Sequence, residues 1–177
     1  MRRRNISLFG LAGWAAYGSA AVAALGVLCI VLLYVGLFTS RKALLIFGPI
    51  NDVCVAIQYA LTLPVLVAVQ RLTRLHSPSL SLFVSTLGAV GIAGILLFQT
   101  LFLAGVMSFT TQLPFAAASI LTIGAWVLVT GAMGRRGNGV PGGVTLDILA
   151  ALYVGYPVWA YRMGRHLLAR ATKPAAA

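Results

Sequence analysis

The chain has 177 residues, of which 60% are hydrophobic and only 8% carry a charge. Soluble domains contain about one-quarter charged residues, so this composition excludes a soluble globular protein and predicts a membrane protein. A formal net charge of +11 would suggest nucleic acid as the partner of a soluble protein, but here the basic residues lie between apolar stretches. In that position they meet anionic lipid head groups. We therefore expect membrane lipids, and no nucleic acid, as partners.

Five apolar stretches are long enough to cross a bilayer as helices, which takes about 20 residues each. In chain order they cover residues 14–38, 51–70, 80–106, 115–133 and 145–164. These stretches and their short connections account for nearly the whole chain. The sequence thus predicts an all-α integral membrane protein, a single bundle of about five transmembrane helices that forms one domain over residues 1–177.

The start of the second stretch is ambiguous. Residues 42–50 (KALLIFGPI) are too few to cross a bilayer and too apolar for an ordinary loop. Interfacial, re-entrant and spanning arrangements all stay open for them. Asn51 and Asp52 follow Pro49 and are residue types that cap a helix N-terminus. We expect these two residues to begin the second helix at the membrane surface.

Five spans would place the two termini on opposite sides of the membrane. The side of the N-terminus, called side A, then holds seven basic residues, and side B holds six, among them Arg162, Arg165 and Arg170. The three arginines at positions 2–4 favour a cytoplasmic N-terminus, whereas the basic tail favours a cytoplasmic C-terminus. The charges therefore do not decide the orientation.

Small residues recur at regular spacing in two spans. The first span carries Ala12, Ala16, Ala20 and Ala24 at four-residue intervals. The third span carries Gly88, Gly91 and Gly94 at three-residue intervals. Such rows let helix backbones approach closely in lipid, where close packing replaces the hydrophobic drive between helices. We expect these residues to form helix-packing faces and the first and third spans to pack near the centre of the bundle.

Polar side chains are predicted to form a layer in the side B half of the bundle. Gln58 lies about two turns inside the apolar region, and Asn51, Gln58 and Thr62 share a narrow arc of their helix. Gln99 falls at a similar depth on the third span, opposite Gln58. Hydrogen bonding between helices and a small pocket or solute path both account for such a layer. Its predicted members are Asn51, Gln58, Thr62, Gln99, Ser119, Thr122 and Tyr156.

The sequence contains no converging catalytic groups. Its two acids, Asp52 and Asp147, begin the second and fifth spans, so the five-span arrangement holds them a membrane thickness apart. No predicted span contains a histidine, and no thiol or metal-binding motif occurs. We expect no catalytic residue, no metal site and no cofactor, and hence a protein that is not an enzyme.

Two functions remain. The first is a non-catalytic multi-pass membrane protein that works as an accessory or scaffold subunit, or as a homo-oligomer, with other membrane subunits or its own copies as partners. The alternative is a small transporter, channel or receptor for a neutral or lipophilic ligand, built on the polar layer. The preference for arginine over lysine, with abundant alanine, glycine and valine, is typical of GC-rich bacterial genomes and favours a bacterial inner (cell) membrane.

Overall fold

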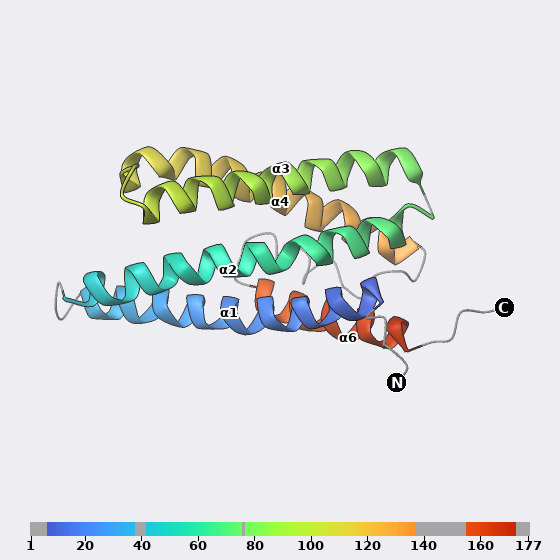
Figure 1. The fold of residues 1–177 in the computed structure, drawn as a ribbon, viewed down its shortest axis with the longest axis horizontal. Coiled ribbons are helices and arrows are strands. Elements are labelled where there is room, and N and C mark those ends of the chain that lie inside the picture. The colour runs from blue at the N-terminus through green and yellow to red at the C-terminus, as the bar shows by residue number, and fades with distance from the viewer. Residues whose placement is uncertain (1–6, 38–41, 76, 137–154, 173–177) are drawn as a thin grey trace, which may run out of the picture.

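The computed structural model describes residues 7–37, 42–75, 77–136 and 155–172, and every element in them is a helix (Figure 1). Four of these helices are long and apolar enough to cross a membrane. The predicted all-α membrane bundle is thereby confirmed. The helices are α1 (Leu8–Leu37), α2 (Lys42–Thr73), α3 (Pro78–Leu103), α4 (Phe109–Arg136) and α6 (Tyr156–Ala171).

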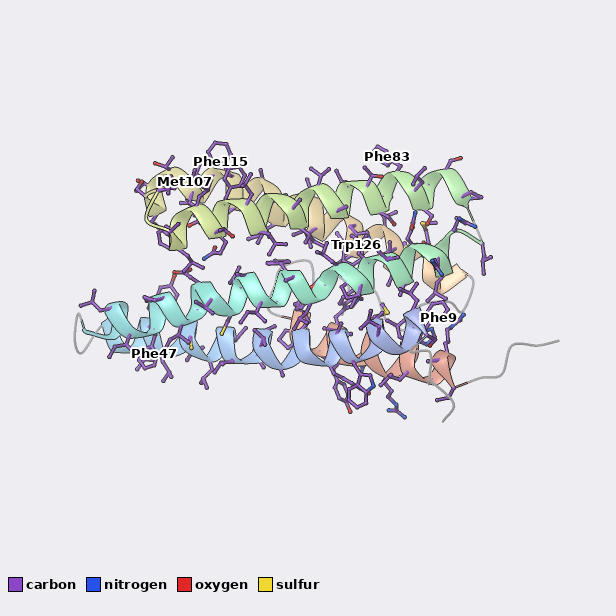
Figure 2. The ribbon with its side chains drawn as sticks, in the orientation of Figure 1. Phe9, Phe47, Phe83, Met107, Phe115 and Trp126 are labelled. Atoms are coloured by element: carbon purple, nitrogen blue, oxygen red, sulfur yellow. The ribbon has the colours of Figure 1, made fainter. Side chains whose placement is uncertain are left out.

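Helix α2 lies between two helix pairs. On one side it packs against α1, which also carries α6, and on the other side it packs against α3, which pairs with α4 (Figure 1). The expectation that the first and third spans pack near the centre of the bundle is wrong, because α2 takes that position and α1 and α3 share no extensive contact. The alanine row of the first span and the glycine row of the third instead pack against different helices. In Figure 2, Phe83 and Phe115 point away from the bundle, while Trp126 lies between the two pairs.

Capping side chains and turn residues explain where most of the helices begin and end. Ser7 Oγ accepts a hydrogen bond from the Gly10 amide at 3.1 Å, so α1 begins six residues before the predicted span. Pro78 occupies the first turn of α3, where its missing amide hydrogen costs nothing. Gly105 has a positive φ of 72°, which allows the tight turn into α4. Ser108 Oγ accepts from the Thr111 amide at 3.2 Å and caps α4.

Helix α2 begins at Lys42, nine residues before its predicted start. Residues 42–50 are therefore a continuous part of α2, and Pro49 lies inside the helix rather than before it. The prediction that Asn51 and Asp52 begin the helix is wrong. A proline removes one amide donor and usually kinks a helix. Helix α1 reaches Leu37 and runs beside this segment, and Leu33 lies 3.8 Å from a Cβ built on Gly48.

The predicted fifth span, residues 145–164, falls partly outside the described residues. Residues 156–164 lie in α6, which continues to Ala171 and spans only 16 residues, or about 24 Å. This length is less than the roughly 30 Å of a hydrocarbon core. Helix α6 is strongly amphipathic: Tyr156, Trp159, Ala160, Met163, Gly164 and Leu167 are buried on one face.

Helix α6 runs antiparallel to the first half of α1. Tyr156 at its start contacts Ser19, Tyr161 contacts Tyr17, and Leu168 near its end contacts Gly13. The last turn of α6 therefore lies at the end of the bundle where α1 begins, which is side A. The prediction placed Arg162, Arg165 and Arg170 on side B, and the structure places them on side A because α6 turns back along α1.

The basic residues also locate the membrane. Arg71 lies in the last turn of α2, and Thr62 precedes it by nine residues, or about 14 Å of helix. Taking Arg71 as one edge of a hydrocarbon core of about 30 Å places Thr62 close to the midplane. Asp52 is 19 residues, or about 28 Å, from Arg71 and lies close to the side B edge.

Candidate functional site

Four residues from three helices form a buried polar network near the midplane, called here the central network. The Tyr156 hydroxyl of α6 lies 2.9 Å from Ser19 Oγ of α1 and 2.5 Å from Thr62 Oγ1 of α2. Both Ser19 and Thr62 donate to the Gln58 backbone carbonyl, at 3.2 Å and 2.8 Å. All four residues are at most 3% exposed. The network therefore joins α1, α2 and α6 where water has no access.

Aromatic rings surround the central network. Tyr156 lies between Tyr59, whose ring centroid is 6.5 Å away, and Trp159, at 5.8 Å. Trp159 in turn meets Trp126 of α4 edge to face at 5.9 Å. Both tryptophans are fully buried, and neither indole N–H has a hydrogen-bond partner among the residues that the structure describes. These rings fill the space between the two helix pairs by apolar packing, at the cost of two unbonded donors.

A second polar cluster lies nearer side B, between α2, α3 and α4. Gln112 Nε2 donates to Gln99 Oε1 at 2.8 Å, and both side chains are buried. Asp52 of α2 interacts with the Gln99 amide. Within the described residues Gln99 Nε2 has no acceptor at hydrogen-bonding distance. Asp52 and Gln99 are therefore neighbours that do not form a hydrogen bond. The side-chain oxygen of Asn51, which precedes Asp52 in α2, is buried and has no hydrogen-bond partner in the described part of the chain.

Ser119 and Thr122 of α4 lie in a third place. They face the glycine row of α3: a Cβ built on Gly94 would lie 2.5 Å from Ser119 Oγ, and one on Gly91 would overlap Thr122 Oγ1. Thr122 Oγ1 donates to the Ser119 carbonyl within its own helix at 2.8 Å. The residues predicted to form one layer thus occupy three separate places, and only Gln58, Thr62 and Tyr156 meet.

The small-residue rows are used mainly within the chain. Ala12, Ala16 and Ala20 are buried in the core of the α1 contacts, whereas Ala24 is exposed. Gly88 faces Trp126: a Cβ there would lie 2.6 Å from the ring. The glycine row is therefore the contact surface between α3 and α4. The alanine row lies in the contacts of α1 with its own neighbours.

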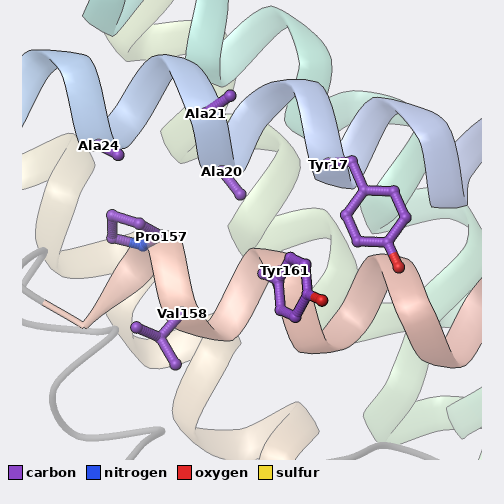
Figure 3. A pocket seen from close by; sticks show the side chains of 7 residues that line it. All are labelled: Tyr17, Ala20, Ala21, Ala24, Pro157, Val158 and Tyr161. Atoms are coloured by element: carbon purple, nitrogen blue, oxygen red, sulfur yellow. The ribbon is translucent and has the colours of Figure 1, made fainter.

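A groove opens where α6 begins, on the outer surface of the α1–α6 pair (Figure 3). Its volume is about 370 Å³, and it is open along one side. In Figure 3, Ala20 and Ala24 point from α1 toward α6, and the rings of Tyr17 and Tyr161 lie together at the other end. The lining residues are Tyr17, Ala20, Ala21, Ala24, Pro157, Val158 and Tyr161.

Titratable groups do not gather in the described part of the chain. No three of its histidine, cysteine, aspartate and glutamate residues lie close enough to hold a metal ion. Asp52 is the one acid in the described ranges. Cys29 and Cys54 are buried free thiols on neighbouring helices.

Three participants in these sites were not predicted. Ser19 is not among the predicted polar residues, although a serine inside a span carries a hydroxyl that needs a partner. Gln112 lies outside the predicted spans, because α4 begins six residues before residue 115. Gly164 approaches the Gly13 backbone, with 2.9 Å between a built Cβ and the Gly13 carbonyl oxygen. A glycine on the apolar face of an amphipathic helix could have indicated this close contact.

The geometry thus consists of a bonded central network, a glutamine pair with a neighbouring acid, and an open apolar groove. Comparison of the chain with known protein families, with curated protein sequences and with solved structures gave no match.

Proposed function

We propose that this chain is a non-catalytic multi-pass protein of a bacterial cell membrane that works by associating with other membrane proteins or with its own copies. The observation that carries the proposal is the exposed apolar end of the α1–α2 hairpin on side B, called here the hairpin tip. It consists of Tyr34, Val35, Leu45, Ile46 and Ile50, which are between 42% and 76% exposed.

The hairpin tip extends beyond the other described helices. Asp52 faces Gln99, and from there α2 continues ten residues to its start, or about 15 Å, whereas α3 ends four residues on, after about 6 Å. The α1–α2 pair therefore projects about 9 Å past α3. Figure 1 shows this projection at the end of the bundle opposite the start of α1.

The depth of the tip makes its apolar surface a candidate interface. With Arg71 taken as one edge of a hydrocarbon core of about 30 Å, Ile50 lies at the side B edge and Leu45 and Ile46 lie about 8 Å past it, where acyl chains no longer cover them. Exposed apolar patches outside the hydrocarbon are unfavourable in water and typical of protein contact surfaces. A partner that covers the tip would remove this surface from water.

Association is tested by crosslinking in native membranes, followed by native mass spectrometry in mild detergent. The wild-type chain should give a defined oligomer or complex. A variant with Tyr34, Leu45 and Ile46 changed to serine should give monomers. Val106→Ser is the matched control, because Val106 is 74% exposed in the α3–α4 connection on the same side but lies off the tip. A wild-type chain that is monomeric in both measurements would refute the proposal.

The charge distribution supports an orientation for this assembly. In the described ranges, side A holds Arg71, Arg74, Arg135, Arg136, Arg162, Arg165 and Arg170, and side B holds Lys42. Seven basic residues on side A against one on side B favour an orientation with side A in the cytoplasm and the hairpin tip on the outer face of the membrane. Alkaline phosphatase inserted at Val106 should be active, and green fluorescent protein fused to the C-terminus should fluoresce.

The central network favours a second candidate, a receptor or transporter for a small neutral or lipophilic ligand. Helix α6 begins near the midplane beside this network, and helices that begin or break at midplane form substrate sites in many transporters. The hydroxyls of the network bond to one another, which supports packing ahead of ligand binding. If replacing Tyr156 by phenylalanine and Thr62 by valine, which removes hydroxyls of the network, leaves ligand binding and flux unchanged, this second candidate fails.

A further inference from the structure

The groove at the start of α6 has an apolar end and a polar end. Its apolar end is formed by Ala24, Pro157 and Val158, close to the midplane level of Tyr156. The opposite end is formed by Tyr17 and Tyr161, whose ring centroids are 5.2 Å apart (Figure 3). Tyrosine is favoured where hydrocarbon meets the head groups. The groove thus has the polarity gradient of one bilayer leaflet.

Two arginines continue the groove toward side A. Arg162 and Arg165 follow Val158 by four and seven residues, which places them on the face of α6 that carries the groove wall. Both are exposed, and within the described residues neither guanidinium makes a hydrogen bond or an ion pair. Arg170, by contrast, donates to His166 Nε2 at 3.0 Å. Arg162 and Arg165 therefore keep their donors available for an anion.

The depth of these arginines suits a phosphate group. Arg165 follows Tyr156 by nine residues, or about 14 Å along α6. Since Tyr156 bonds to Thr62 near the midplane, Arg165 lies about half a hydrocarbon thickness away, at the level of the head groups. Asp52, the one acid in the described ranges, lies near the opposite edge of the membrane. No negative charge in these ranges competes for the arginines.

We propose that this groove binds an anionic phospholipid, with one acyl chain against Ala20, Ala24, Pro157 and Val158 and the phosphate held by Arg162 and Arg165. Planar guanidinium groups bind phosphate through paired hydrogen bonds. Charge complementarity and the polarity gradient both specify a lipid of the side A leaflet. The site does not depend on the hairpin tip, which lies at the other end of α1.

The test measures lipid retention by native mass spectrometry. The full chain is purified in mild detergent and titrated with phosphatidylglycerol or phosphatidylcholine. The wild-type chain should retain one phosphatidylglycerol in preference to phosphatidylcholine. Arg162→Gln and Arg165→Gln should each reduce this preference roughly fivefold, as expected for the loss of one positive charge at the membrane surface. Ala24→Phe should abolish retention by filling the groove while the charges stay in place.

Two controls separate a site from general attraction. Arg71→Gln with Arg74→Gln removes two charges at the same membrane edge, on α2, and should leave the preference unchanged. Val31→Phe enlarges an exposed side chain in the other half of α1, outside the hairpin tip, and should leave retention unchanged. Equal losses in the α2 variant, or full retention in Ala24→Phe, would overturn the proposal. The proposal would also be overturned if the mass spectrum showed a bound protein, either a second copy or another helix, in place of the lipid.

Discussion

The contacts α3–α4 and α1–α6 bring two helices close together in different ways. Between α3 and α4, the three glycines spaced three residues apart on α3 contact Ser119, Thr122 and Trp126. The two helices lie side by side over much of their length. Between α1 and α6, the approach is concentrated at Gly13 and Gly164, and the central network closes the far end. The first contact depends mainly on shape, with a single glutamine hydrogen bond near its side B end, whereas the second has a network of hydroxyl hydrogen bonds near its middle.

The difference follows from the composition of the helices. Helix α3 is apolar along its glycine row, so lipid competes with α4 for that surface and close packing is the main interaction that favours the pair. Helix α6 is amphipathic and has one face that lipid does not solvate well, so it gains by placing Tyr156 against Ser19 and Thr62. A mostly apolar helix is therefore held mainly by fit, while an amphipathic helix combines fit with several polar contacts.

The largest expected effect is at Gly91. A Cβ there would lie 2.8 Å from the Ser119 backbone oxygen, which cannot rotate away as a side chain would. Gly91→Leu should lower the free energy of unfolding by about 3 kcal/mol. Unfolding in mixed micelles of detergent and dodecyl sulfate measures this change. Val90→Leu, at an exposed neighbouring position, should change stability by less than about 0.5 kcal/mol. Equal stability of the two variants would contradict a contact based on shape.

A smaller and more local effect is expected at Gly164. A Cβ there would lie 2.9 Å from the Gly13 carbonyl oxygen and 3.1 Å from the Tyr17 ring. Gly164→Leu should cost about 2 kcal/mol and release α6 while α3 and α4 stay packed. Hydrogen–deuterium exchange should then rise in peptides of α6 alone. Ala169→Leu, on the exposed face of α6, is the control. Faster exchange throughout the bundle would show that α6 is not a separate unit.

The central network should contribute less than the glycine contacts. Tyr156→Phe and Thr62→Val each remove one partner of the 2.5 Å contact and should each cost about 1 kcal/mol. Because the two hydroxyls bond to each other, the double variant should cost about 0.6 kcal/mol less than the sum. Unfolding of the four proteins in the same micelles gives this coupling energy. Strictly additive costs would mean that the two hydroxyls do not interact.

The smallest effect is expected at the glutamine pair. Gln112→Leu removes the donor to Gln99 Oε1 and should cost about 0.6 kcal/mol. Changing Gln99 to leucine as well should recover part of this loss, since neither position of the pair would then bury an unpaired amide. The same unfolding assay orders the wild type, the single variant and the double variant. A double variant clearly less stable than Gln112→Leu would show that Gln99 has a further role, with Asp52 the nearest candidate.

Helices that are apolar throughout were predictable from the sequence. Four predicted spans overlap α1 to α4, because a run of apolar residues identifies a membrane helix whatever its neighbours are. The start of α2 was misplaced, since Pro49 and Asn51 are typical of a helix start but here lie beside α1 and inside a continuing helix. Helix α6 extends beyond the predicted fifth span. The basic residues on its outer face, among them Arg162 and Arg165, are typical of a tail outside the membrane rather than of a helix packed on the bundle.

The candidate site was only partly predictable. Counting residues along a helix gave the depth of Gln58, Thr62 and Tyr156, and these three do meet. Depth does not specify which helices are neighbours, so Gln99 was placed opposite Gln58 although it pairs with Gln112. Neighbouring helices are determined by packing over the whole bundle. The groove at α6 could not be predicted either, because it exists only where one helix begins against the middle of another.

The position of α6 has a consequence for the order of assembly. Its polar outer face and its length of 16 residues make it a poor candidate for independent insertion by the translocation machinery. It is also synthesised after α1 to α4. Its buried face matches α1 and α2, which leave the ribosome before it, so α6 can find its place only after both are in the membrane. Final maturation is then the docking of a late amphipathic helix onto an early hairpin.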